Sequence, residues 1–179
     1  MQKWRRLAAV LIAAAFLNPA SGGAERFLVI SDTHITEEAR DDDAMQEAVV
    51  QAARETDAVL LLGDSTNNAH PEEHNLVLQW TREIRQRAGA EVYILPGNHD
   101  YRPLFGPDEF TAWYTSCGWG RAFSRDIATA GYAAMTENGT CLIMLDTNDF
   151  DQTRSALPYG GIAQITLDWV RDVLTSLPD

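Results

Sequence analysis

The chain has 179 residues, of which 26 are Asp or Glu and 14 are Lys or Arg, so its formal net charge is −12 at pH 7. With 45% hydrophobic and 22% charged residues, it has the composition of a globular protein and not of a disordered one. The acidic balance argues against a basic surface that binds the phosphate backbone of nucleic acids.

The first segment, residues 1–24, has the pattern of a secretory signal peptide. Three early basic residues precede an uncharged run at residues 7–17, and small residues follow up to Ala24. This run is shorter than the roughly 20 residues of a membrane span, so an uncleaved anchor is the weaker alternative. We expect cleavage after Ala24 or after Gly22, export to the periplasm or the cell exterior, and no membrane contact beyond this segment.

Three short apolar runs in the remaining chain predict strands. They are Phe27–Ile30, Ala58–Leu62 and Glu91–Leu95. None of them alternates between apolar and polar residues, which is typical of strands buried on both faces of a parallel sheet. Between them, the pattern predicts the connecting helices that such a sheet needs, one from Asp42 or Asp43 to about Glu55 and one from Pro71 to about Ala88, ending at Gly89.

The second half of the chain predicts shorter elements. These are a helix over Pro107–Ser116, strands over Arg121–Asp126, Tyr132–Glu137 and Thr140–Leu145, and a final helix from Gly161. Asn138-Gly139 predicts a two-residue hairpin turn, which is a sufficient explanation for the glycosylation sequon that it forms with Thr140. Because no linker or internal repeat separates these segments, we expect residues 25–179 to form one domain.

Polar side chains follow the first three predicted strands directly. Asp32 and His34 come after the first strand, Gly63-Asp64 after the second, and Gly97-Asn98-His99-Asp100 after the third. Ligands bind at the carboxyl ends of strands in open α/β sheets. In extended backbone, Asp32 and His34 would point to the same side. Carboxylates with an imidazole and an amide oxygen suit Mn, Fe, Zn, Co or Mg and not a thiolate-bound metal.

These three motifs resemble the first three motifs of the calcineurin-like metallophosphoesterases. Residues 63–68, 145–148 and 160–170 are also similar to an exported bacterial branch of that family. The resemblance covers residues 27–179. It implies an α/β fold in which a β-sandwich is flanked by helices, a four-layer α/β/β/α arrangement.

The resemblance also implies a site with two divalent metal ions and no other cofactor. Asp32, His34 and Asp64 would bind the first ion, Asp64 and Asn98 the second, and His99 would act as the catalytic residue on the leaving oxygen. The ions would generate a metal-bound hydroxide that attacks phosphorus in line. We therefore expect a metal-dependent phosphomonoesterase or phosphodiesterase that acts on a small phosphate ester.

The chain departs from the family pattern in two ways. The family completes its metal site with later histidines, whereas this chain has four histidines and none after His99. We therefore expect an N-terminal portion whose C-terminal part is missing; the alternative is an inactive remnant that binds one metal ion or phosphate weakly. In addition, Asn67 stands where many relatives carry an aspartate that pairs with the active-site histidine. Asp100 and Asp146 are expected to support neighbouring groups.

Two other residue pairs are candidates for chemistry. His70 and His74 have a spacing compatible with zinc on a helix, but Pro71 stands where a zinc protease has its glutamate and favours an exposed helix start. For Cys117 and Cys141, export permits a disulfide, and their spacing leaves both a bond and two separate buried thiols open.

Overall fold

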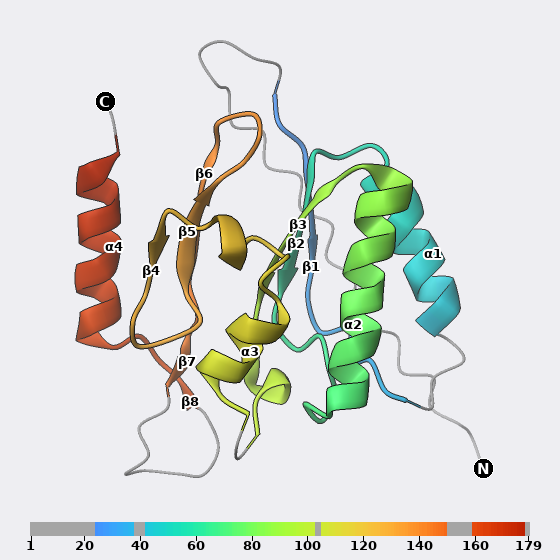
Figure 1. Cartoon of the computed structure of the whole chain (residues 1–179), viewed down its shortest axis with the longest axis horizontal. Helices are drawn as coiled ribbons and strands as arrows, with labels where there is room; N and C mark the ends of the chain where they lie inside the picture. The colour runs from blue at the N-terminus through green and yellow to red at the C-terminus, as the bar shows by residue number, and fades with distance from the viewer. Residues whose placement is uncertain (1–23, 38–41, 103–104, 150–158, 178–179) are drawn as a thin grey trace.

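The computed structural model describes residues 24–37, 42–102, 105–149 and 159–177 of the chain (Figure 1). The segment interpreted as a signal peptide lies outside these ranges except for Ala24, so its assignment stays a prediction. Among the described residues, no helix is both long and apolar enough to cross a membrane.

Three parallel strands form the first sheet, as predicted. They are β1 (Phe27–Ile30), β2 (Ala58–Leu62) and β3 (Glu91–Leu95), in the order β1-β2-β3. Phe27 lies opposite Ala58, and Ala58 lies opposite Glu91 on its other side. Because all three strands run the same way, their carboxyl ends meet at one edge of the sheet, the lower edge in Figure 1.

Two helices cover one face of this sheet (Figure 1). They are α1 (Asp42–Ala53), which ends two residues before the predicted boundary, and α2 (Pro71–Glu83), which continues into a π-helical turn, η1 (Ile84–Ala88). Gly89 ends the turn with a φ of 76°, a conformation that glycine adopts without strain.

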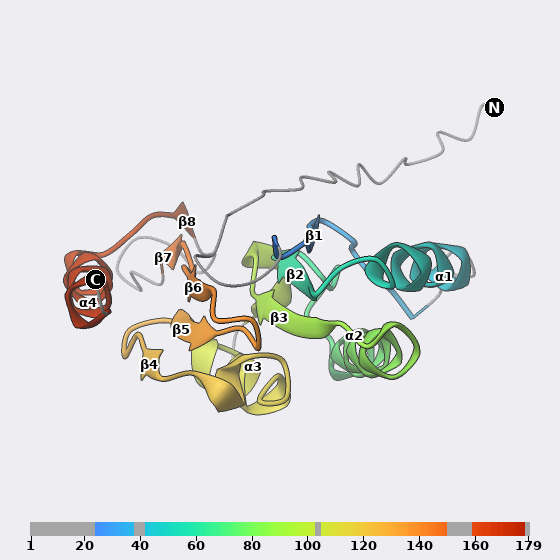
Figure 2. The ribbon, with the colours of Figure 1, turned by 90° about the horizontal axis from the view of Figure 1, so that it is seen from above.

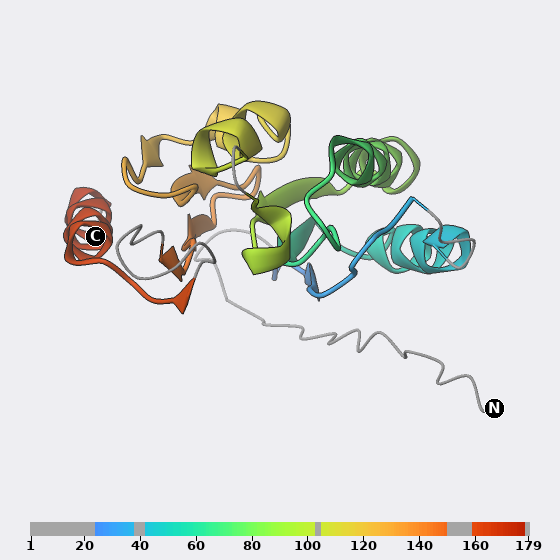
Figure 3. The same cartoon turned by 90° about the horizontal axis from the view of Figure 1, so that it is seen from below.

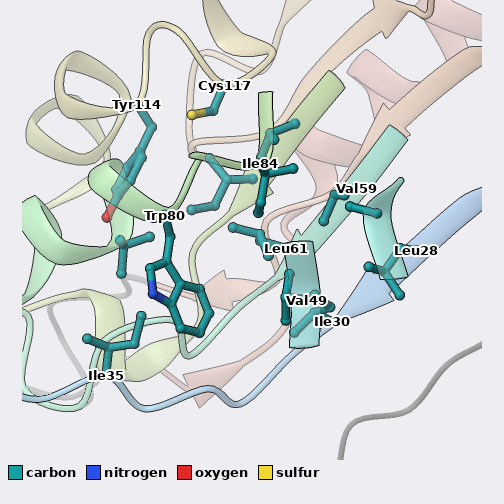
Figure 4. Packing of buried hydrophobic residues seen from close by; sticks show 14 of the residues in the cluster. Leu28, Ile30, Ile35, Val49, Val59, Leu61, Trp80, Ile84, Tyr114 and Cys117 are labelled. Carbon is teal, nitrogen blue, oxygen red and sulfur yellow. The ribbon is translucent and has the colours of Figure 1, made fainter. Parts of the chain in front are cut away.

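The helices and the first sheet share a buried apolar cluster (Figure 4). Its members come from both layers: Leu28, Ile30, Val59 and Leu61 from the strands, and Val49, Trp80 and Ile84 from the helices and η1. Full burial of one such side chain stabilises a fold by about 1.5–3 kcal/mol. This cluster therefore holds the strands, and the loops that follow them, in fixed positions.

A second sheet is antiparallel and consists of short strands. They are β4 (Ser124–Arg125), β5 (Tyr132–Met135) and β6 (Cys141–Met144), in the order β4-β5-β6. All three are shorter than predicted, and a 3₁₀ turn, η3 (Trp119–Arg121), takes the start of the first. The hairpin between β5 and β6 is confirmed.

The two-residue turn predicted for this hairpin is wrong. Gly139 donates its N–H to the carbonyl of Thr136 over 3.1 Å, and Thr136 donates to the carbonyl of Thr140 over 2.9 Å. A two-residue type I′ turn needs a positive φ at both central residues. Only Gly139, at 91°, has one, so the loop is longer than Asn138-Gly139 alone.

The antiparallel sheet packs on the face of the first sheet opposite α1 and α2 (Figure 2). A second buried cluster joins the two sheets, with Phe27, Ala58, Tyr93 and Leu95 from the first and Tyr132, Ala134 and Met144 from the second. Tyr132 also accepts a hydrogen bond from the backbone N–H of Ile94 over 3.1 Å. The fold is thus mixed α/β, with one parallel and one antiparallel layer facing each other.

The remaining elements lie around these layers. They are a 3₁₀ turn η2 (Asn98–Asp100), the short helix α3 (Pro107–Trp113), the strand pair β7 (Asn148–Asp149) and β8 (Tyr159–Gly160), and α4 (Gln164–Ser176). The β7-β8 pair was not predicted, and α3 and α4 are shorter than predicted. The indole N–H of Trp169 on α4 donates to the hydroxyl of Ser124 on β4 over 2.9 Å.

Candidate metal centre

The segments that follow β1 and β2 run side by side beyond the end of the sheet, the end that Figure 3 shows from below. Asp32 donates its backbone N–H to the carbonyl of Gly63 over 3.1 Å, and His34 donates to the carbonyl of Asp64 over 3.0 Å. These bonds continue the parallel pairing past the strands. They hold Asp32 and His34 against the loop that carries Asp64.

The backbone at these three residues is left-handed. The φ angles are 57° at Asp32, 45° at His34 and 50° at Asp64, a region that residues other than glycine rarely adopt. The extended backbone expected between Asp32 and His34 is therefore wrong. Strain of this kind costs roughly 1–3 kcal/mol per residue and persists only where the surrounding structure holds it, often at functional sites.

The side chains of Asp32, His34 and Asp64 nevertheless converge. Each offers a ligand atom, and these atoms all lie within 4.8 Å of one another. In the described part of the chain, no other three His, Cys, Asp or Glu side chains form such a group. Nδ1 of His34 is buried and has no hydrogen-bond partner among the residues that the structure describes. A buried polar atom without a partner is costly, and a histidine ring nitrogen is a common ligand of divalent metals. The donor set therefore fits a metal ion.

Asn98 and His99 reach the same place from the end of β3. Asn98 is exposed and lines a cavity of about 390 Å³ together with Asp32 and Asp64. The backbone N–H of His99 donates to Oδ1 of Asp64 over 2.9 Å. Its ring meets that of His34 edge to face, with 4.7 Å between the ring centroids. The structure thus brings together all five residues that the sequence nominated.

The imidazole of His99 is oriented by a backbone carbonyl. Its Nδ1 lies 2.7 Å from the carbonyl oxygen of Asn67. A carbonyl oxygen can only accept a hydrogen bond, so Nδ1 carries a proton and Nε2 remains for other contacts. The acceptor that orients His99 is thus the main chain of Asn67.

Two glycines allow the loop after β2 and the loop after β3 to approach each other. A Cβ atom on Gly97 would lie 2.2 Å from Oδ1 of Asp64, closer than two such atoms can approach. Gly63 has a φ of 88°, and a Cβ there would lie 3.0 Å from the Cα of Gly97. The glycines preceding Asp64 and Asn98 are therefore required by contact between the loops.

A buried carboxylate, Asp100, binds backbone groups in both of these loops. It accepts the backbone N–H groups of Gly97, Ser65 and Thr66 over 2.8, 3.2 and 2.8 Å. Burial raises the pKa of Asp100 to about 6, although these N–H donors oppose the rise. Asp100 therefore supports the loops, as expected.

A second buried carboxylate, Asp146, connects the end of β6 to the segment after η2. It accepts the hydroxyl of Tyr101 over 2.7 Å, the N–H of Ala130 over 3.1 Å and the side-chain amide of Asn148 over 2.7 Å. That amide also donates to the carbonyl of Pro96 over 3.1 Å. The role expected for Asp146 in holding a neighbouring loop is confirmed, whereas the role of Asn148 was not predicted.

The exposed helix start predicted for His70 and His74 is wrong for His74. His74 is fully buried, stacks on Phe105 with 4.3 Å between ring centroids, and places Nδ1 2.8 Å from the hydroxyl of Tyr114. Desolvation by burial lowers its pKa to about 4. His70 is exposed, so the two histidines lie in different environments and neither joins the metal-ligand group.

Cys117 and Cys141 are separate free thiols. Cys117 is buried, and Cys141 is partly buried, which raises the pKa of its thiol. Of the two alternatives, separate thiols are therefore confirmed, although only one of them is fully buried.

A comparison with protein-family models gives a match. A family model described as calcineurin-like phosphoesterase matches residues 25–178, a range that includes every residue of the candidate metal centre. A search of curated proteins finds no match to the chain.

Proposed function

The chain belongs to the calcineurin-like phosphoesterase family, whose members hydrolyse phosphate esters with divalent metal ions, and we propose that it is a phosphomonoesterase or phosphodiesterase with a two-metal site. The observation that carries this proposal is the convergence of Asp32, His34 and Asp64, in which a buried imidazole nitrogen of His34 has no partner in the described part of the chain. This set contains the oxygen and imidazole donors that first-row divalent metals prefer.

Four side chains would hold the ions. Asp32, His34 and Asp64 offer three ligands to the first ion, and Asn98 offers an amide oxygen to the second, with Asp64 shared between them. Bound divalent ions would supply positive charge to the phosphoryl oxygens and activate water near neutral pH. Oδ1 of Asp64 already accepts the N–H of His99, so its position is set before any metal binds.

His99 would act on the leaving group. Because Nδ1 donates to the carbonyl of Asn67, the ring can deliver a second proton only from Nε2. In its protonated form, the imidazole would donate from Nε2 to the oxygen that develops negative charge as the ester bond breaks. The edge-to-face contact with the His34 ring keeps this imidazole beside the proposed ligands.

We further propose a four-layer α/β/β/α architecture. Figure 2 supports it, since α4, the antiparallel sheet, the parallel sheet and the pair α1 and α2 follow one another across the molecule.

For residues 1–24 we propose a cleaved signal peptide, with an exported domain from residue 25 onward. The cavity of about 390 Å³ is suited to a small phosphate ester, and the net charge of −12 disfavours a nucleic-acid partner.

The experiment strips the purified protein of metal with a chelator and restores Mn²⁺ in steps. Hydrolysis of bis-p-nitrophenyl phosphate and p-nitrophenyl phosphate then separates diesterase from monoesterase activity, while calorimetry gives the metal stoichiometry. Two Mn²⁺ ions per chain and turnover that depends on them are the results that would support the proposal. Asp64→Asn should lower turnover by orders of magnitude because it weakens both ions.

Asp108→Asn is the matched control, since Asp108 is exposed on α3. Turnover that survives chelation, or that is equal in Asp64→Asn and wild type, would contradict the proposal.

A second candidate is a protein that binds one metal ion without turnover. It is favoured by the fact that only one three-residue His, Cys, Asp or Glu group is found among the described residues, and one Mn²⁺ per chain without hydrolysis would support it.

A further inference from the structure

The peptide group between Asn67 and Asn68 links the His99 ring to a buried carboxylate. On one side, the carbonyl oxygen of Asn67 accepts from Nδ1 of His99 over 2.7 Å. On the other side, the N–H of Asn68 donates to Oε2 of Glu73 over 2.8 Å. The carbonyl and the N–H belong to one planar, trans peptide unit, in which they point in opposite directions. Fixing the N–H therefore fixes the direction of the carbonyl.

Glu73 is well suited to hold this peptide. It lies in the first turn of α2, and its side chain is buried, with 2% of its surface exposed. Besides the N–H of Asn68, its Oε2 accepts the N–H of His70 over 3.2 Å, and its Oε1 accepts the side-chain amide of Asn68 over 3.0 Å. The carboxylate thus binds the loop at three donors around the peptide that faces His99.

The loop also contains a strained residue that these contacts must hold. Ala69 has a φ of 53°, which is unfavourable for a residue with a Cβ atom. Its N–H lies 3.2 Å from the hydroxyl oxygen of Thr66, which leaves Glu73 to hold the residues on either side of it.

We propose that Glu73 is a positioning residue for His99 and acts through the Asn67–Asn68 peptide. Its negative charge polarises that peptide, which makes the Asn67 carbonyl a stronger acceptor for Nδ1. The result is a His99 ring held in one orientation with Nδ1 protonated. The catalytic meaning of this orientation rests on the proposed function, but the orientation itself is a property of the metal-free protein.

A purely structural role for Glu73 makes a different prediction. Its bond to the N–H of His70 stabilises the start of α2, and such a cap is worth about 1 kcal/mol. Glu109 makes the equivalent bond at the start of α3, where its Oε2 accepts the N–H of Gly106 over 2.9 Å. Glu109→Ala is therefore the matched control, because it removes a helix cap with no connection to His99.

The test compares the ¹⁵N side-chain resonances of His99 in the metal-free full chain at about pH 8, where histidine is ordinarily neutral. In wild type, we expect the tautomer with the proton on Nδ1. In Glu73→Ala, the resonances should shift toward a mixture with the Nε2–H tautomer, and in Glu109→Ala they should not shift. Glu73→Gln should retain most of the wild-type pattern, since its amide oxygen can accept both backbone N–H groups if the Asn68 amide flips.

Turnover gives a second readout. Glu73→Ala should lower kcat by roughly 10-fold or more, the usual effect of removing a partner that orients a functional side chain. In the His99→Ala background, the same change should lower kcat no further, because residues that act in series are not additive. An additive loss, or an equal loss in Glu109→Ala, would overturn the proposal.

The outcomes separate this proposal from the proposed function. If wild type shows no turnover, the hydrolase assignment fails, while the His99 resonances still decide the role of Glu73. If Glu73→Ala does not fold, Asn68→Ala serves as the second variant. Asn68 is exposed, and losing its amide frees Oε1 of Glu73. A smaller tautomer shift in the same direction is then expected, and unchanged His99 resonances in the folded variants would overturn the proposal.

Discussion

Asp100 and Thr66 join the two loops that carry Asp64 and His99. The Asp100 carboxylate accepts the backbone N–H of Thr66 over 2.8 Å and lies 3.0 Å from its hydroxyl. The contact spans 34 residues of sequence, and both side chains are fully buried. The loops after β2 and β3 therefore behave as one unit, and the ligands on them share one set of supports.

Replacing the buried carboxylate should loosen this unit. Asp100→Asn puts an amide where an oxygen accepts N–H groups, so at least one buried donor loses its acceptor, at a cost of about 1–3 kcal/mol. Urea denaturation of the metal-free protein should show this loss in the free energy of unfolding. The exposed Asp108→Asn should leave it nearly unchanged. Equal stability of the two variants would show that Asp100 does not hold the loops.

Adding one methyl group between the loops should damage metal binding. In Gly97→Ala, the new Cβ would lie 2.2 Å from Oδ1 of Asp64 and 2.4 Å from its backbone nitrogen, so both the carboxylate and its loop must move. Gly97 has a φ of −100°, which alanine adopts readily, so the effect is steric alone. We expect roughly 10–100-fold weaker Mn²⁺ binding by calorimetry.

The control for this change is Gly106→Ala. A Cβ there would lie 3.7 Å from Oε2 of Glu109, an ordinary contact outside the candidate site. It should leave Mn²⁺ affinity unchanged. If Gly97→Ala also binds Mn²⁺ with wild-type affinity, then Asp64 is not a ligand in the position that the structure gives it.

The sequence was sufficient to predict where the site lies. Apolar runs 27–30, 58–62 and 91–95 predicted strands of a parallel sheet, and parallel strands end at a common edge. Asp32, Asp64 and Asn98 follow those ends within three residues, so their proximity is a consequence of topology. Local pattern and chain direction therefore predicted which side chains lie near one another, whereas the roles expected of them came from the family resemblance.

The local geometry of the site could not be predicted in the same way. The left-handed backbone at Asp32, His34 and Asp64 depends on hydrogen bonds between loops, and periodicity carries no signal for it. The burial of His74 depends on Phe105 and Tyr114, which come from the segment beyond β3. Both features arise from contacts between residues far apart in sequence. Patterns among residues that are close in sequence therefore cannot predict them.

Glu73 has two roles, a cap at the start of α2 and a contact with the peptide beside His99, and only the cap could be predicted from the sequence. A glutamate in the first turn of a helix, two residues after Pro71, is a common helix-start signal. Its contact with the peptide beside His99 depends on the path of the loop between Asn67 and His70, including the positive φ of Ala69. The capping pattern therefore explained the glutamate fully, and gave no indication of its contact with the peptide beside His99.

Tyr101 and Tyr114 provide a matched pair of buried hydroxyls with different partners. Tyr101 donates to the carboxylate of Asp146 over 2.7 Å, whereas the hydroxyl of Tyr114 lies 2.8 Å from Nδ1 of His74, which is neutral near pH 7. Hydrogen bonds to charged groups contribute about 1.5–3 kcal/mol, and those between neutral groups about 0.5–1.5 kcal/mol. Tyr101→Phe should therefore destabilise the protein more than Tyr114→Phe in urea denaturation. The reverse order would contradict this ranking of the two hydrogen bonds.

Stability should fall in mildly acidic solution because of His74. Its pKa is about 4 in the folded protein and about 6.5 when unfolded, so between these values the unfolded chain binds more protons. Stability due to the neutral ring is complete above about pH 6.5 and is lost as the pH falls toward 4. Desolvation is the main cause of the low pKa, and nearby Arg102 adds to it, while Glu73 and the backbone carbonyl of Asp100 oppose it.

The measurement compares wild type with His74→Phe, which keeps an aromatic ring against Phe105 but has no proton to gain. Between about pH 7.5 and pH 5, wild type should lose about 2 kcal/mol more free energy of unfolding than the variant. Asp100, whose raised pKa of about 6 acts in the opposite direction, is present in both proteins, so its contribution cancels in the difference. Chelator in both samples removes any effect of metal binding. Parallel pH profiles for the two proteins would mean that His74 is not held neutral by burial, and the stacked position beside Phe105 would then need another explanation.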